Sequence, residues 1–127
     1  ETNKIMGWGK QFGTTEVPID STCVRVGSMR CHSQSLTFKL TKDVPLADIE
    51  DMIKNDNEWV KYVPNERVAT EQNLTAANVA GTMTIPVGRV RKLAMGPQYL
   101  GAFTIGDQLL WGAAEPLRRM LRIIQAA

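Results

Sequence analysis

The chain has 127 residues, of which 43% are hydrophobic, so it has the size of one domain and can bury a usable core. Its formal net charge of only +2 does not provide the clustered basic face that nucleic-acid binding usually needs, and we expect no nucleic acid among its partners. No run of about 18 apolar residues occurs, and the first residues form neither a basic leader nor an apolar core, which predicts a cytoplasmic protein with no membrane contact and no signal peptide. The abrupt start at Glu1, without an initiator methionine, is what we expect of a fragment.

The first 40 residues are predicted to form a loop and two short strands. Three glycines among residues 6–15 favour the loop, because glycine disfavours the interior of helices and strands. Apolar residues then alternate with polar ones over 24–26 and again over 36–40, which predicts two strands that flank a bend at Gly27. The stretch 23–34 contains the only histidine, both cysteines and two arginines, so we expect the chemistry there.

Arg25 and His32 are the candidate functional side chains of this stretch. They lie seven residues apart, and on a straight strand they would face opposite sides because strand side chains alternate with period 2. A bulge or turn at Gly27 would reset this phase and bring both onto one face of a cleft. A lone strand histidine can also be a hydrogen-bonded structural residue, and Arg25 can merely cap a sheet edge, so the pattern alone leaves both alternatives open.

Cys23 and Cys31 are predicted to be free thiols, because nothing in the sequence indicates a secretory context. Cys31 and His32 are neighbours and would point to opposite faces of a strand, which makes them a poor nucleophile and base pair. Even with Cys23 they would not complete the four ligands of a structural zinc site, so we expect no metal. The pattern assigns no role to either cysteine.

Four further elements are expected before the last helix. An apolar stripe at helical spacing predicts a helix over 45–53 with its proline in the first turn, and alternation predicts a strand over 59–63. The polar stretch 66–81 has no clear period and predicts only a loop or short helical turns. Aromatic and β-branched residues predict strands over 87–95 and 99–105, joined by a glycine-proline turn.

The last element is predicted to be a helix over about 107–125 with a buried apolar stripe. Apolar residues recur there at steps of three and four: Leu110, Ala113, Leu117, Leu121 and Ile124. Pro116 lacks a backbone donor and clashes with the preceding turn, so we expect a kink or a join between two helices near 113–116. Three arginines in the last turns indicate a solvated or inter-domain face.

Several segments resemble one known family. The stretch 23–34 has the sequence Cys-Val-Arg-Val-Gly-Ser-Met-Arg-Cys-His-Ser-Gln, which closely resembles a segment of the bacterial aspartate-β-semialdehyde dehydrogenases. Further matching segments are Glu1–Ile5, Val63–Asn65, Thr84–Arg89, Met95–Pro97 and Gly106–Met120. The resemblance covers almost the whole chain and concerns the carboxy-terminal third of that family.

The predicted strands, crossing helix and closing helix favour an α+β domain with a mixed, mostly antiparallel sheet that is covered by helices on one side. The resemblance implies the same architecture, similar to the carboxy-terminal catalytic and dimerisation domain of glyceraldehyde-3-phosphate dehydrogenase-like enzymes. It implies that residues 1–127 are the carboxy-terminal part of a substrate-binding and dimerisation domain in a homodimer. The closing helix is then expected to pack toward an amino-terminal nucleotide-binding domain that this chain does not contain.

For the complete enzyme, the resemblance implies reversible, NADP-dependent reductive dephosphorylation of aspartyl phosphate to aspartate semialdehyde, with release of phosphate. This step leads toward lysine (through diaminopimelate), threonine and methionine. The chain has no glycine-rich dinucleotide fingerprint after a strand, and neither of its cysteines occupies what looks like the family's nucleophile position. The fragment alone is therefore expected to be inactive.

The resemblance also implies a role for three residues. His32 looks like the general acid/base, and an imidazole suits proton transfer at neutral pH. Arg25 looks like the residue that binds the substrate carboxylate, because a guanidinium offers two parallel donors. Gln108 matches a position that contacts the nicotinamide cofactor, and an amide can both donate and accept hydrogen bonds.

Two other classes of function remain open at this stage. A non-catalytic amino-acid-binding regulatory domain could share the α+β layout and use Arg25 for its ligand. An assembly module could use exposed aromatic residues such as Trp8, Phe12 and Tyr99 for pairing. The sequence upstream of Glu1 distinguishes the classes, because only the dehydrogenase needs a dinucleotide loop and a cysteine nucleophile there.

Overall fold

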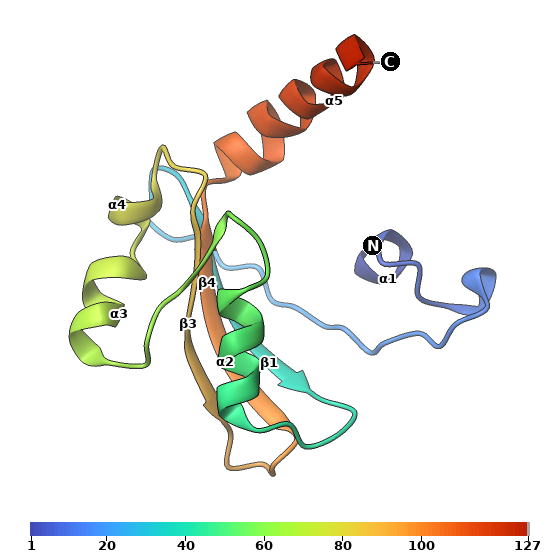
Figure 1. Cartoon of the computed structure of the whole chain (residues 1–127), viewed down its shortest axis with the longest axis vertical. Helices are drawn as coiled ribbons and strands as arrows, with labels where there is room; N and C mark the ends of the chain where they lie inside the picture. Colours follow the sequence, from blue (N-terminus) through green and yellow to red (C-terminus); the bar gives the residue numbers. More distant parts are fainter. Residues whose placement is uncertain (127) are drawn as a thin grey trace.

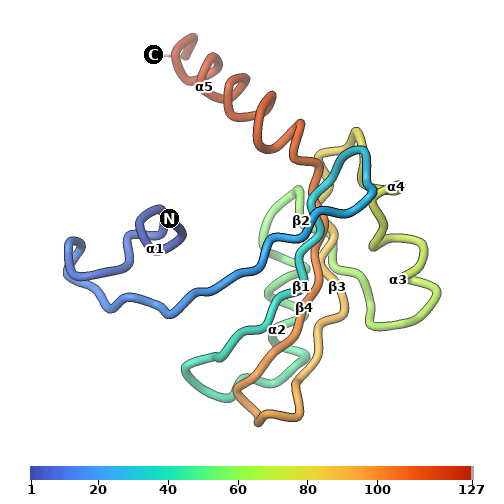
Figure 2. The backbone as a smooth tube through the Cα atoms, turned by 180° about the vertical axis from the view of Figure 1, so that it is seen from behind, coloured from blue at the N-terminus to red at the C-terminus, as the bar shows by residue number. Residues whose placement is uncertain are grey.

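A four-stranded sheet forms the centre of the computed structural model, which describes residues 1–126 (Figure 1). Helices pack on the sheet, while the amino-terminal arm and the last helix extend away from it (Figures 1 and 2). The elements are α1 (Thr2–Ile5), the 3-10 helix η1 (Lys10–Phe12), β1 (His32–Lys39), α2 (Leu46–Lys54), β2 (Val60–Tyr62), α3 (Arg67–Asn73), α4 (Ala76–Val79), β3 (Ile85–Lys92), β4 (Tyr99–Gly106), the π-helix η2 (Leu110–Ala114) and α5 (Glu115–Ala126).

The strand order in the sheet is β1-β4-β3-β2. β4 pairs antiparallel with both β1 and β3, and only the short β2 runs parallel to its neighbour β3. The predicted mixed, mostly antiparallel sheet is therefore confirmed, as are the strands expected near 36–40, 59–63, 87–95 and 99–105 and the helix near 45–53.

Helices cover both faces of the sheet, so the expectation of helices on one side only is wrong. Two separate clusters of buried residues lie on the sheet: Ile49, Val90, Leu100 and Ala102 on the α2 face, and Val63, Leu74, Val79 and Ile105 on the face of α3 and α4. Leu100 and Ile105 are an odd number of positions apart on β4, so their side chains point to opposite faces. The stretch 66–81, whose pattern was uninformative, supplies the two short helices of the second face.

A β-bulge in β3 allows this strand to serve both clusters. Between Gly88 and Arg91 the register shifts against β4, and Arg89 adopts a left-handed φ of 54°. Gly88 lies under the second cluster, where a Cβ would stand 2.5 Å from the Leu74 side chain and 3.0 Å from Val63 Cβ. Only glycine fits this close approach without movement of its neighbours.

The strand predicted over 24–26 is wrong, because residues 14–31 form neither helix nor strand. β1 begins only at His32 and is an edge strand, and no neighbouring strand pairs with the alternating residues before it. Alternation indicates a strand only where a partner satisfies the backbone groups. The arm instead runs as an extended chain from α1 to the sheet (Figure 2).

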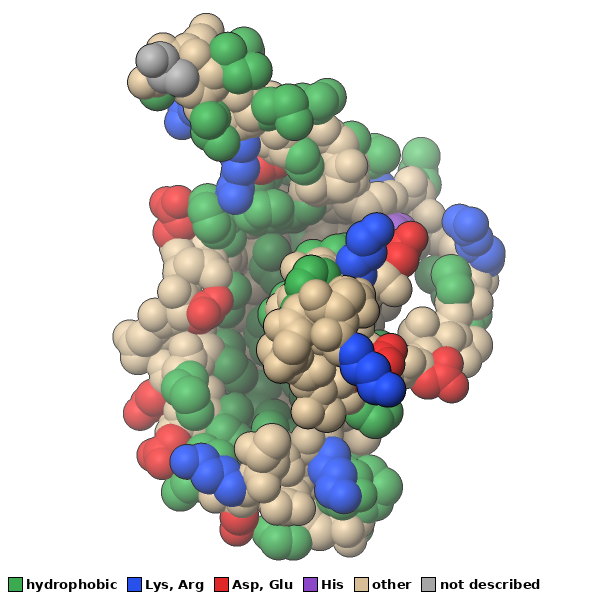
Figure 3. Space-filling model, turned by 90° about the vertical axis from the view of Figure 1, so that its right-hand side faces the viewer, with side chains coloured by type: hydrophobic (Ala, Val, Ile, Leu, Met, Phe, Trp, Pro, Cys, Tyr) green, Lys and Arg blue, Asp and Glu red, His purple; other side chains and the backbone are tan. Residues whose placement is uncertain are grey.

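The closing helix forms as predicted, but its apolar stripe is not buried within the described chain. Leu117, Leu121 and Ile124 are all exposed, and α5 projects from the sheet, with hydrophobic side chains along its surface at the top of Figure 3. The join expected near Pro116 is present: η2 ends at Ala114, and the Glu115 N–H donates to the Leu110 carbonyl five residues earlier. This wider turn precedes the proline, whose ring would clash in a regular α-helical turn.

Gly88→Ala is predicted to destabilise the fold by roughly 1 to 3 kcal/mol, because its methyl group overpacks the cluster around Leu74. Gly106→Ala, in which the new Cβ meets no atom within 4 Å, is the matched control. The melting temperature of both variants tests this. An equal melting temperature for the two would contradict the packing described here.

Candidate functional site

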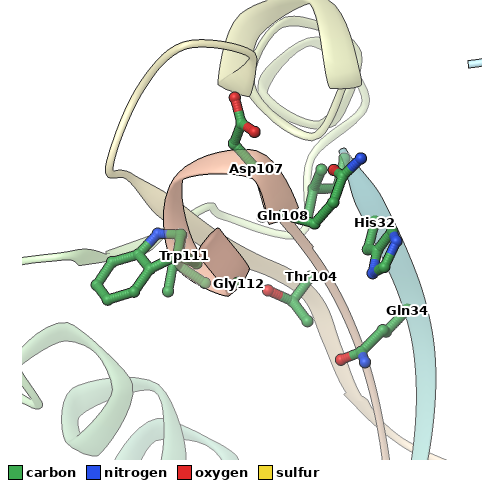
Figure 4. A pocket seen from close by; sticks show the side chains of 10 residues that line it. His32, Gln34, Thr104, Asp107, Gln108, Trp111 and Gly112 are labelled. Carbon is green, nitrogen blue, oxygen red and sulfur yellow. The ribbon is translucent and has the colours of Figure 1, made fainter. Parts of the chain in front are cut away.

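His32 and Gln34 lie on one face of the sheet, beside a cavity of about 430 Å³. They are two positions apart on β1 and therefore point to the same side. Gly106 and Thr104 stand directly opposite them on β4 and continue the same face. The start of the closing helix also lines the cavity, through Gln108 next to His32 and through Trp111 and Gly112 across from them (Figure 4).

Gln108 connects this cavity to the chain that precedes β1. Its side-chain Oε1 accepts a hydrogen bond of 2.5 Å from the Cys31 N–H. The oxygen end of the amide is thereby engaged, which leaves Nε2 as the donor, and Figure 4 shows the amide at the start of β1, above His32. Within the described chain, Gln108 is thus both a wall of the cavity and a tie to the backbone next to His32.

Asp107 is a completely buried carboxylate between the end of β4 and the closing helix. Its Oδ2 accepts a hydrogen bond of 2.7 Å from the Gly81 N–H and lies 2.5 Å from Nη2 of Arg30, while its Oδ1 accepts from the Leu109 N–H at 3.0 Å. Burial alone would raise the pKa of Asp107, but the two backbone donors and the guanidinium outweigh burial and hold this pKa below its ordinary value. The carboxylate stays charged and joins three segments.

Trp111 forms an apolar wall of the cavity and is fixed by neighbouring aromatic and charged groups. Its ring meets the Trp59 ring edge to face, with 5.4 Å between centroids. The Arg119 guanidinium lies 4.3 Å from the Trp59 centroid and 5.2 Å from the Trp111 centroid. Glu115, also buried, accepts hydrogen bonds from Arg118 and Arg119. This cluster sets the direction in which α5 leaves the sheet.

His32 is a group that can transfer protons and Gln108 one that can orient a polar ligand, but no cysteine thiol lines the cavity among the described residues. Cys31 packs into the opposite cluster, where its Sγ lies 3.7 Å from the Ala76 carbonyl. Burial, and to a lesser extent the Asp107 charge, raise the pKa of the Cys31 thiol, which disfavours its thiolate form. The expectation that Cys31 and His32 face opposite sides of the sheet agrees with this placement.

The structure brings two of the three predicted site residues together. His32 and Gln108 line the same cavity, whereas Arg25 is exposed on the arm and does not line it. Sequence reasoning missed Arg30 and Asp107, which meet although they lie 77 positions apart in the chain. An available signal was the position of Asp107 directly before an apolar helical run, which is typical of a helix N-cap.

Within residues 1–126, no helix combines the length and the apolar composition that crossing a bilayer requires. In the same part of the chain, no three histidine, cysteine or acidic side chains converge where they could hold a metal ion.

Comparison with known proteins shows which family has this α+β domain with a cavity at the edge of its sheet. A family model described as "Semialdehyde dehydrogenase, dimerisation domain" matches residues 1–111. The chain is similar to an aspartate semialdehyde dehydrogenase from Francisella tularensis, with 44% identity and a TM-score of 0.84 over 91% of this chain and 32% of that one. It shares the fold of aspartate semialdehyde dehydrogenase II from Vibrio cholerae, solved in complex with ASA, with 18% identity and a TM-score of 0.79 over 98% of this chain and 34% of that one.

The chain therefore belongs to the semialdehyde dehydrogenase dimerisation-domain family. It spans about a third of the length of either relative.

Glu115→Gln is predicted to remove a pH-dependent part of the stability that fixes α5. Hydrogen bonds from Arg118 and Arg119 lower the pKa of Glu115 from its ordinary 4.5 to about 2, so its stabilisation is complete above pH 4.5 and is lost as the pH falls toward 2. The melting temperature of the variant should lie below that of the unsubstituted protein at neutral pH, and the gap should close between pH 4.5 and 2. Glu71→Gln, which removes the carboxylate of an exposed ion pair, should show little gap at any pH. A gap for Glu115→Gln that stays constant with pH would contradict this.

Proposed function

We propose that this chain is the substrate-binding and dimerisation part of an NADP-dependent aspartate semialdehyde dehydrogenase that forms a homodimer in the cytoplasm. The observation that carries the proposal is that His32, the only histidine, lies beside the Gln108 amide at a cavity of about 430 Å³ in a domain of this family. The complete enzyme would convert aspartyl phosphate to aspartate semialdehyde and phosphate, a step toward lysine, threonine and methionine. The chain alone would be inactive, because no cysteine thiol lines the cavity among the described residues.

His32 is proposed to move the proton of the reacting hydroxyl. In the forward direction a cysteine thiolate from the rest of the enzyme displaces phosphate from the acyl phosphate and forms a thioester. A bound, reduced NADP would supply the hydride that converts this thioester to the alkoxide of a thiohemiacetal, and His32 would give that alkoxide its proton. His32 takes up the hydroxyl proton as the carbon–sulfur bond breaks, which releases the aldehyde and the thiolate.

Gln108 is proposed to bind the nicotinamide end of the cofactor. Its oxygen is engaged by the Cys31 N–H, so its Nε2 is the group available to a ligand, and this donor suits the carboxamide oxygen of a nicotinamide. The cavity volume is in the range of small-ligand sites. The fit concerns this end of the cofactor only, and a phosphate-binding loop would come from the nucleotide-binding domain.

Arg25 is proposed to bind the substrate carboxylate once the arm is placed against the rest of the enzyme. In the described chain the guanidinium is exposed and makes no ion pair, so both of its parallel donors are available. The arm runs from α1 toward the loop before β1, and Arg25 precedes His32 by only seven positions. We propose that the rest of the enzyme holds the arm so that the two residues reach one substrate.

Two exposed surfaces suit the proposed partners. The face of β1 and β4 opposite α2 has a shallow hollow of about 240 Å³ that contains Ser35, Arg91 and Phe103, and it would form part of the interface with the second subunit. The apolar stripe of α5 would pack toward the nucleotide-binding domain, because large apolar side chains are stabilised by removal from water.

His32→Asn in the full-length enzyme is predicted to lower kcat by roughly 100-fold or more while the substrate KM stays nearly unchanged, because a neutral amide cannot transfer the proton. Ser33→Ala, on the opposite face of β1, is the matched control and should keep its turnover. Steady-state kinetics of both variants test this. Weak substrate binding with preserved kcat would make His32 a binding residue instead.

Arg25→Lys is predicted to lower kcat/KM for the substrate roughly 10- to 150-fold, because lysine keeps the charge but loses one charge-assisted hydrogen bond worth about 1.5 to 3 kcal/mol. The melting temperature should not change, since Arg25 has no contact partner among the described residues. Arg67→Lys, a change of an exposed arginine on α3, serves as the control. An unaltered kcat/KM in Arg25→Lys would remove this residue from the substrate site.

A further inference from the structure

Two consecutive residues directly before His32 are tied to two consecutive residues at the start of the closing helix. Nη2 of Arg30 lies 2.5 Å from Oδ2 of Asp107, and the Cys31 N–H donates to Oε1 of Gln108 at 2.5 Å. We use the term clasp for these four residues. The clasp joins parts of the chain that lie 77 positions apart and encloses the point where β1 begins.

The backbone inside the clasp has a conformation that it would not favour by itself. Cys31 has a φ of 81°, in the left-handed region that is unfavourable for a residue with a Cβ. Such a conformation persists only where surrounding contacts determine it. Since the next residue is His32, the orientation of the imidazole depends on the contacts that hold Cys31.

Asp107 cannot itself act on a ligand in the cavity. Its side chain has no exposed surface, and both oxygens are engaged by Gly81, Leu109 and Arg30. Figure 4 shows the carboxylate turned away from His32, toward the loop that follows α4. Its effect on the cavity is therefore transmitted through Arg30 and through the helix start that carries Gln108.

We propose that Arg30 and Asp107 are positioning residues that set the orientation of the His32 imidazole for proton transfer. This inference rests on the proposed function, because it requires that His32 moves a proton. The physical basis is that the Arg30–Asp107 ion pair holds the strained Cys31 backbone in place, and a small displacement of a proton-transfer group lowers the rate without lowering substrate affinity.

The test uses Arg30→Gln, His32→Asn and the double variant in the full-length enzyme. Arg30 is partly exposed and does not line the cavity, so its replacement neither opens a core nor touches the substrate. Arg30→Gln should lower kcat about tenfold while the substrate KM stays within about twofold. Arg30→Lys, which keeps a cation beside Asp107, should recover most of this loss. Arg67→Gln, which removes an exposed ion pair on α3, should keep full turnover.

The double variant separates positioning from a general structural role. If Arg30 acts through His32, Arg30→Gln should cause no further loss of kcat in the His32→Asn background. A further tenfold loss in the double variant, or an unchanged kcat in Arg30→Gln alone, would overturn the positioning role while the role of His32 stands. If His32→Asn alone keeps its kcat, the proton-transfer role of His32 and the positioning role fail together.

Discussion

The buried Asp107 carboxylate is the constraint on which the arrangement of the site depends. An ion without exposed surface is costly to bury, and the structure offsets this cost with two backbone donors and the Arg30 guanidinium. These donors come from the loop after α4, from the first turn of the closing helix and from the residues before β1. One side chain therefore fixes where the sheet ends, where the helix begins and how the chain enters the edge strand that carries His32.

The sequence was informative where the structure is local and periodic. The alternation over 99–105 and the helical stripe over 45–53 corresponded to β4 and α2, since both elements bury one face against the other. The residues 24–26 alternate just as clearly, yet they form no strand, because a strand also requires a neighbour that the pattern cannot supply. Pro116 correctly indicated a join between two helices. The π-helical form of the turn before it could not be predicted from the sequence, because it depends on which backbone groups pair in the folded chain.

The candidate site could be predicted only in part for the same reason. The resemblance drew attention to His32 and Gln108, and the pleat of β1 together with its pairing to β4 explains why they share one cavity. The ion pair of Arg30 with Asp107 has no local pattern, because its partners meet only after the sheet has formed. For Arg25 the sequence indicated the chemistry, because an arginine can bind a carboxylate. It could not indicate the position of Arg25 relative to the cavity, because that position depends on how the arm is held.

Two parts of the chain have apolar surfaces that the described residues leave open. Ile123 and Ile124 on α5 are 70% and 67% exposed, and the arm carries the fully exposed Met29. Isolated apolar side chains are common on protein surfaces, but a whole helix stripe is typical of a contact with another domain or chain. Since the chain spans about a third of its relatives, the proposed nucleotide-binding domain would supply this contact and bring the nucleophile to the cavity.

Hydrogen exchange of three backbone amides tests the central role of Asp107 most directly. The N–H groups of Gly81 and Leu109 bind its carboxylate, and the Cys31 N–H binds the adjacent Gln108. We predict that all three exchange slowly and that Arg30→Gln accelerates them together, while amides at the centre of α2 keep their protection. Exchange of the three at unprotected rates in the unsubstituted protein, or unchanged exchange in Arg30→Gln, would show that this carboxylate does not hold the site together.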